Sequence, residues 1–99
     1  MPILECKKVG FYAEGDELSF FNWIESIKAI KKYYGEGDII YLKLSASKLS
    51  DSNLRELIAL FYRYKIEMTQ LKQFLNESNE SWFQKNPQSF WHRKVFGKA

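Results

Sequence analysis

The chain has 99 residues, the length of one domain, and 45% of them are hydrophobic while 27% are charged. This balance is typical of a globular protein and excludes an intrinsically disordered chain. The net charge is +3. All of the excess lies in residues 79–99, because residues 1–78 contain 11 basic and 11 acidic side chains.

Several classes of protein are excluded by what the sequence lacks. Cys6 is the only cysteine, so neither an intrachain disulfide nor a thiolate zinc site is possible. The longest apolar run, residues 57–62, is far shorter than the roughly 20 residues of a membrane-spanning helix. The first residues contain neither a basic start nor an apolar run, so no signal peptide is indicated and we expect a cytoplasmic protein.

The first predicted elements are a strand over residues 5–12 and a helix that begins at Asp16. Apolar side chains alternate in the strand, which ends at the turn Glu14-Gly15-Asp16. Asp16 is a suitable N-cap, and Glu17 complements the positive end of the helix dipole. One apolar face with helical spacing is formed by Phe20, Trp23, Ile24 and Ile27.

Residues 29–44 are β-prone on both sides of the loop Gly35-Glu36-Gly37-Asp38, which predicts a hairpin. Residues 39–44 are apolar on both parities, as in a central strand with both faces covered. The alternative is a single strand over residues 29–44 that follows a longer first helix in a three-stranded α/β sheet. The two glycines make the hairpin the preferred prediction.

A second helix is predicted to begin after the N-cap Ser50 and to end near Tyr64. Its buried stripe contains Leu54, Leu57, Ile58 and Phe61. Residues 68–75 are predicted to form a last strand, in which Leu71 and Phe74 are the apolar members. A polar connector and then a short helix over residues 88–95 complete the chain.

The order strand, helix, strand, strand, helix, strand predicts a ferredoxin-like α+β fold with a mostly antiparallel four-stranded sheet. Right-handed crossovers place both main helices on one face of that sheet, which leaves the other face open. We expect a core domain of residues 1–78 and an aromatic, basic extension of residues 79–99 that packs on it. The extension is the apolar material available to cover the open face.

No catalytic, metal or cofactor site is predicted, and we expect a protein that is not an enzyme. Cys6 lies in a predicted strand, where a thiol usually packs as a small apolar group, and the sole histidine, His92, is 86 positions away. Glu-Gly-Asp occurs at residues 14–16 and 36–38, which offers carboxylates for a hard cation. We interpret these as turn residues, because a third strand parallel to the first would place the two loops at opposite ends of the sheet.

Residues 81–98 interleave aromatic and basic side chains, which are enriched where proteins bind partners. We predict a non-enzymatic interaction module that binds another protein or itself through this segment. Nucleic-acid binding is the alternative, since rings stack on bases and cations neutralise phosphates. The structural interpretation is that the rings are core residues that cover the open sheet face. The predicted interface consists of Trp82, Phe83, Phe90, Trp91, His92, Arg93, Lys94 and Phe96.

Three stretches carry a resemblance to a known group of proteins: residues 15–23, residues 54–64 and residues 82–97. The chain resembles a family of small uncharacterised bacterial proteins of about this length. The resemblance implies a single bacterial cytoplasmic domain. The family has no assigned activity, so it implies no functional residues.

Overall fold

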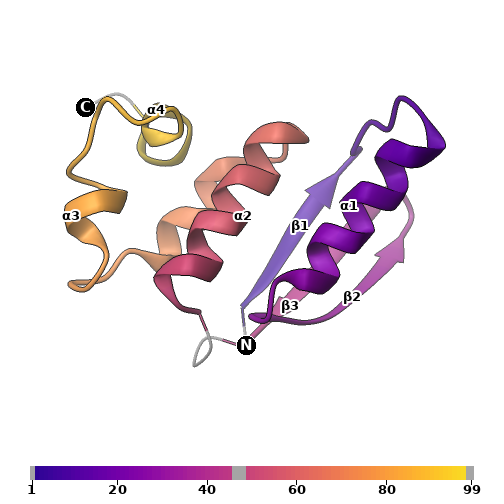
Figure 1. Ribbon diagram of the computed structural model, residues 1–99, viewed down its shortest axis with the longest axis horizontal. Coiled ribbons are helices and arrows are strands. Elements are labelled where there is room, and N and C mark those ends of the chain that lie inside the picture. The colour runs from indigo at the N-terminus through magenta and orange to yellow at the C-terminus, as the bar shows by residue number, and fades with distance from the viewer. Residues whose placement is uncertain (1, 46–48, 98–99) are drawn as a thin grey trace.

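The computed structural model describes residues 2–45 and 49–97, which form one sheet and a layer of helices (Figure 1). The three strands are β1 (Ile3–Lys7), β2 (Ile30–Glu36) and β3 (Ile39–Leu44). They form an antiparallel sheet in the order β1-β3-β2. The helices are α1 (Glu14–Ser26), α2 (Asp51–Arg63), the 3₁₀ helix η2 (Met68–Phe74), α3 (Glu80–Phe83) and α4 (His92–Phe96).

The prediction of a four-stranded ferredoxin-like sheet is wrong, because the predicted fourth strand is the 3₁₀ helix η2. Its buried side chains are Met68, Leu71 and Phe74, which are spaced three residues apart. Three residues is the repeat of a 3₁₀ helix, whereas the side chains on one face of a strand repeat every two. Leu71 and Phe74 have opposite parity, so a strand would have buried only one of them.

The helix η2 lies against the outer edge of β1, where the predicted fourth strand would have paired. Gln70 accepts a hydrogen bond from the backbone N–H of Glu5 at 2.7 Å and donates one to the Glu5 carbonyl oxygen at 2.9 Å. On the other side of β1, the Pro2 carbonyl oxygen accepts from the N–H of Leu44 in β3, and the N–H of Lys8 donates to the carbonyl oxygen of Asp38, the residue before β3. Alternation along the strand therefore directs the Glu5 backbone away from β3, and a side-chain amide satisfies it.

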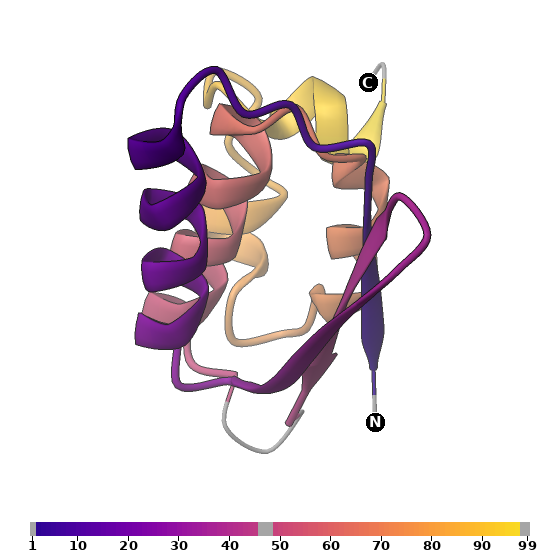
Figure 2. The same cartoon turned by 90° about the vertical axis from the view of Figure 1, so that its right-hand side faces the viewer.

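The core lies between the sheet and the helices α1 and α2, which cover the same face (Figure 2). Ser50 is the N-cap of α2, since its Oγ accepts a hydrogen bond from the N–H of Asn53 at 3.1 Å, as predicted. The helix α1 begins at Glu14, two residues before the predicted start. The fully buried side chains of these layers include Leu4, Cys6, Phe20, Ile24, Leu42, Leu44, Leu54, Leu57, Ile58 and Phe61.

Strand β1 is shorter than predicted, because regular pairing ends at Lys7. Lys8 has a φ of 51°, a left-handed conformation that interrupts an extended strand. The side chain of Phe11 nevertheless reaches the core, where its ring lies 5.4 Å from that of Phe20. The alternation of apolar residues therefore extends beyond Lys7, where the strand itself ends, and it led to a predicted strand that is too long.

The predicted hairpin is confirmed, and the single-strand alternative is wrong. Glu36 and Ile39 are paired across the two-residue loop Gly37-Asp38. Gly37 has a φ of 65° and Asp38 does not have a positive φ, which is the pattern of a type II′ turn. The pairing register shifts by one residue between Ile30 and Lys32.

The C-terminal segment does not cover the outer face of the sheet, contrary to the sequence prediction. It packs instead beside α2 and η2, on the side of the helical layer away from α1 (Figure 1). The outer sheet face carries Lys7, Lys32, Glu36 and Ile3, all of which are exposed. Charged side chains along the strands keep this face compatible with water, so no apolar cover is required.

Candidate functional site

Five of the predicted interface residues are packed into the structure. Phe83 is fully buried, and its ring lies 5.0 Å from that of Phe96. The indole of Trp91 donates to the carbonyl oxygen of Phe83 at 3.2 Å, and His92 Nε2 lies 2.7 Å from the carbonyl oxygen of Gln84. These contacts fix the fold of the C-terminal segment and use much of its aromatic surface internally.

Trp82 joins this segment to α2. Its indole Nε1 donates to the Asp51 carboxylate at 3.2 Å. The guanidinium carbon of Arg55 lies 3.9 Å from the centre of its ring, within the range of a cation–π interaction. Both partners come from α2, so Trp82 anchors the C-terminal segment to the helical layer.

The remaining predicted residues, Phe90, Arg93 and Lys94, are exposed. Phe90 is 52% exposed and lies edge-to-face against Tyr62 of α2, which is 44% exposed, at a ring distance of 4.6 Å. Lys94 Nζ lies 5.9 Å from the centre of the Tyr62 ring. An exposed pair of rings in mutual contact is the main apolar feature of this side of the molecule.

The two rings border a surface hollow of about 480 Å³ that reaches across α2 to α1. We call this region the Tyr62–Phe90 surface. Its apolar groups come from three separate parts of the chain: α1, α2 and the loop before α4. The residues that line it are Trp23, Ala59, Tyr62, Arg63, Lys65 and Phe90.

The charged residues that line the Tyr62–Phe90 surface are both basic, and α2 places them. Arg63 is the last residue of α2, and Lys65 follows the C-cap. The N–H of Ile66 donates to the Phe61 carbonyl oxygen at 2.9 Å, and Lys65 has a φ of 58°, which together form a Schellman-type helix end. Glycine is favoured at this position, so Lys65 is held in a conformation that costs about 1 kcal/mol.

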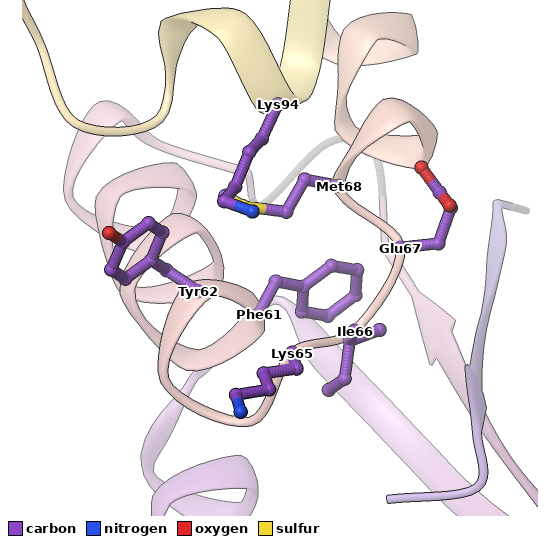
Figure 3. Close-up of a pocket in the computed structure, with 7 residues that line it drawn as sticks. All are labelled: Phe61, Tyr62, Lys65, Ile66, Glu67, Met68 and Lys94. Carbon is purple, nitrogen blue, oxygen red and sulfur yellow. The ribbon is translucent and has the colours of Figure 1, made fainter.

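A second hollow of about 550 Å³ adjoins this surface at Tyr62 and Lys65 (Figure 3). Lys94 reaches down into it from α4 towards Met68, whereas the Glu67 carboxylate points away. Arg63, Lys65 and Lys94 form no ion pair with any residue in the described part of the chain. Three unpaired cations therefore surround the exposed rings.

The groups considered for catalysis do not form an active site. Burial raises the pKa of the Cys6 thiol to about 12, so the thiol is protonated and unreactive at neutral pH. Residues 14–16 form the first turn of α1, not a loop. They and residues 36–38 lie at the same end of the sheet, not at opposite ends, because β3 is antiparallel to β1 and Lys8 N–H donates to the Asp38 carbonyl oxygen at 3.0 Å. Within residues 2–45 and 49–97, however, no three His, Cys, Asp or Glu side chains are close enough to hold a metal ion.

Sequence reasoning missed the contribution of the helices to this surface. Tyr62 lies next to the buried Phe61, outside the apolar stripe of α2, and is flanked by the charged Arg63. A large aromatic residue on the polar side of a well-defined amphipathic helix was the available signal. The contribution of Trp23 depends on how α1 packs beside α2, which no local pattern reveals.

No helix in the described ranges is both long and apolar enough to cross a membrane. No protein-family model, curated protein or solved structure matches this chain.

Proposed function

We propose that this protein is a non-enzymatic binding module that recognises an acidic protein segment with apolar side chains on the Tyr62–Phe90 surface. The observation that carries the proposal is the exposed contact between Tyr62 and Phe90 beside unpaired cations. Aromatic residues and arginine dominate the energetics of protein interfaces. The proposal retains Phe90 and Lys94 from the sequence prediction and adds residues of α1 and α2.

The charges favour an acidic partner. Arg63 and Lys65 line the hollow itself, and Lys94 lies beside Tyr62. Carboxylates of a partner would pair with these cations, while its apolar side chains would enter the hollow bordered by Phe90. Complementary charge accelerates encounter and selects the partner, and burial of the rings supplies affinity.

Nucleic acid fits this surface less well than an acidic peptide. Stacking requires free ring faces, but the Arg55 guanidinium lies over the Trp82 ring, and the Trp91 ring contacts the rings of Trp82 and Phe90. Tyr62 and Phe90 contact each other edge-to-face, so their two rings do not form a flat surface on which successive bases could stack. Binding of an oligonucleotide is nevertheless measured as an outcome of the test below.

The test uses three probes: a short synthetic peptide of Glu, Leu and Phe, a matched peptide with Lys in place of Glu, and a single-stranded oligothymidylate. Each is titrated into isotope-labelled protein, and backbone amide shifts are followed by NMR. We expect the acidic peptide to shift the amides of Ala59, Tyr62, Arg63 and Phe90. The basic peptide should not bind.

Two pairs of variants locate the site. Phe90→Ser and Lys94→Glu are each expected to weaken binding of the acidic peptide by at least about tenfold. The matched controls are Leu18→Ser and Lys28→Glu, which should not change binding of the acidic peptide. Leu18 is an apolar residue of α1 that is 57% exposed, and Lys28 is an exposed cation. Equal binding of both peptides, shifts confined to other regions, or tighter binding of the oligothymidylate would contradict the proposal.

A further inference from the structure

We infer that β2 is a self-complementary edge through which two copies of this chain pair into a dimer with one continuous six-stranded sheet. This inference is independent of the Tyr62–Phe90 surface. It rests on the contrast between the two edges of the sheet, on the backbone groups that β2 leaves unpaired, and on the arrangement of charge about Tyr34.

The two edges of the sheet differ in whether the chain itself closes them. The outward backbone groups of Glu5 on β1 are both satisfied by Gln70. On β2, no described residue forms a hydrogen bond of this kind with Tyr33 or Gly35. In Figure 1, β2 is the outermost strand on the side of the sheet away from α2.

The register of the hairpin identifies which groups of β2 face outward. Glu36 and Ile39 flank the two-residue turn, so they form a hydrogen-bonded pair. Alternation along the strand then makes Tyr34 bond to β3 and directs the N–H and C=O groups of Tyr33 and Gly35 to the open edge. No hydrogen bond to the backbone of Tyr33 or Gly35 from outside the hairpin is formed in the described part of the chain, so these groups are free to pair with another strand.

The side chains on the outer face of β2 carry opposite charges on the two sides of Tyr34. Lys32, Tyr34 and Glu36 share this face, because they are two residues apart and lie opposite Lys43, Tyr41 and Ile39. In an antiparallel pair of β2 strands centred on Tyr34, Lys32 of each copy lies opposite Glu36 of the other. Neither Lys32 nor Glu36 forms an ion pair in the described part of a single chain.

The same register also pairs the backbone and the rings. Tyr33 of one copy faces Gly35 of the other, and the two residues exchange both of their outward hydrogen bonds. Tyr34, whose ring stacks on that of Tyr41 at 5.1 Å, lies opposite Tyr34 of the second copy. A row of four tyrosines would then cross the middle of the outer face.

The single open edge determines what kind of assembly forms. A sheet with two open edges adds copies head to tail without limit, whereas a sheet with one open edge closes after two copies. Because Gln70 occupies the middle of the β1 edge at Glu5, we expect β2 to pair with β2. The assembly is therefore a two-fold dimer and not a fibre.

The experiment measures the dimerisation constant by sedimentation velocity over a series of protein concentrations up to the millimolar range. Lys32→Glu and Glu36→Lys each place two like-charge pairs across the interface, and each is expected to weaken dimerisation by at least about tenfold. The double variant Lys32→Glu/Glu36→Lys restores both pairs and should dimerise like the wild type. An equimolar mixture of the two single variants should form heterodimers.

Lys7→Glu is the matched control, because Lys7 lies on the same face at the closed edge β1 and its replacement should not alter dimerisation. Phe90→Ser should also dimerise normally, which separates this inference from the proposed peptide site. A wild type that is monomeric at every concentration would overturn the inference. So would a dimer that neither single variant weakens, or a mixture that associates no better than its components.

Discussion

The side-chain amide of Gln70 mimics a strand by bonding both backbone groups of Glu5, a residue 65 positions earlier in the chain. One donor and one acceptor on a single side chain replace the exchange of hydrogen bonds that a paired strand residue would make. The contact joins η2 to the edge of the sheet.

Replacement of Gln70 is expected to destabilise the protein by about 1–3 kcal/mol, because two partly buried hydrogen bonds are lost. Gln70→Ala removes both bonds to Glu5 together with a local one to the Glu67 carbonyl oxygen, and Gln70→Glu removes the donor to the Glu5 and Glu67 carbonyl oxygens. Gln73→Ala is the matched control, since Gln73 is exposed on the same helix and binds only the carbonyl oxygen of residue 70. Urea denaturation measures the three free energies of unfolding. Equal losses for Gln70→Ala and Gln73→Ala would show that the Glu5 contact contributes nothing.

Replacement of Phe83 and of Phe90 is expected to affect stability differently, because Phe83 is a buried and Phe90 an exposed residue of the C-terminal segment. Phe83→Ala should cost about 3–5 kcal/mol of stability, because it opens a cavity at a fully buried position. Phe90→Ala should change stability by less than about 1 kcal/mol, since the ring is 52% exposed. Thermal denaturation followed by tryptophan fluorescence provides the measurement. A reversed order of the two variants would mean that the segment packs differently from this structure.

Stability is expected to fall at alkaline pH because of Cys6. The pKa of its buried thiol is about 12 in the folded protein, compared with an ordinary value of 9.0. The unfolded chain therefore loses this proton first, and stability that is complete below pH 9 is lost as the pH rises towards 12. The ionisation of Cys6 lowers the free energy of unfolding by at most about 1.4 kcal/mol per pH unit.

The Cys6→Ala variant isolates this contribution. Tyr33 has a pKa raised by its hydrogen bond to Glu25, and Tyr41 and Tyr64 have pKa values raised mainly by desolvation, so all three act in the same direction. These three tyrosines remain in the variant, so the difference between the alkaline unfolding profiles of the wild type and of Cys6→Ala is caused by Cys6. Parallel profiles for variant and wild type would indicate that the thiol is accessible to solvent. Rapid labelling of the folded protein by a thiol reagent at neutral pH would lead to the same conclusion.

Helix α2 and the β2–β3 hairpin were predictable because their signals are local. Ser50 caps the helix through a residue three positions away, and the buried stripe repeats over the next three turns. The hairpin needs a residue with positive φ at one position of its turn, and glycine is there. Each of these elements is specified by no more than fifteen consecutive residues.

The role of residues 68–75 was not predictable by the same means. In a short segment, two apolar residues three apart are compatible with an irregular strand and with a 3₁₀ helix, and only Met68 at the next position of the repeat favours the helix. The partner that decides between them, the edge of β1, lies more than sixty residues away. A glutamine that pairs with a strand has no distinctive sequence context.

The candidate site was predicted in part for a related reason. Composition drew attention to the C-terminal segment, but it does not reveal which rings pack internally, so Phe83 was assigned to an interface although it is fully buried. The segment was expected over the bare face of the sheet, whereas Trp82 directs it to Asp51 and Arg55 of α2. Tyr62 became part of the surface only because the segment lies on that side.

The distance in sequence between Glu5 and Gln70 has a consequence for synthesis of the protein on the ribosome. The three strands are complete once residue 44 has emerged, but the residue that closes the edge of β1 follows 26 positions later. At roughly 5–20 residues per second, the nascent sheet exposes both of its edges for seconds. During that interval the edge of β1 is as open to pairing as the edge of β2, and Gln70 then closes it.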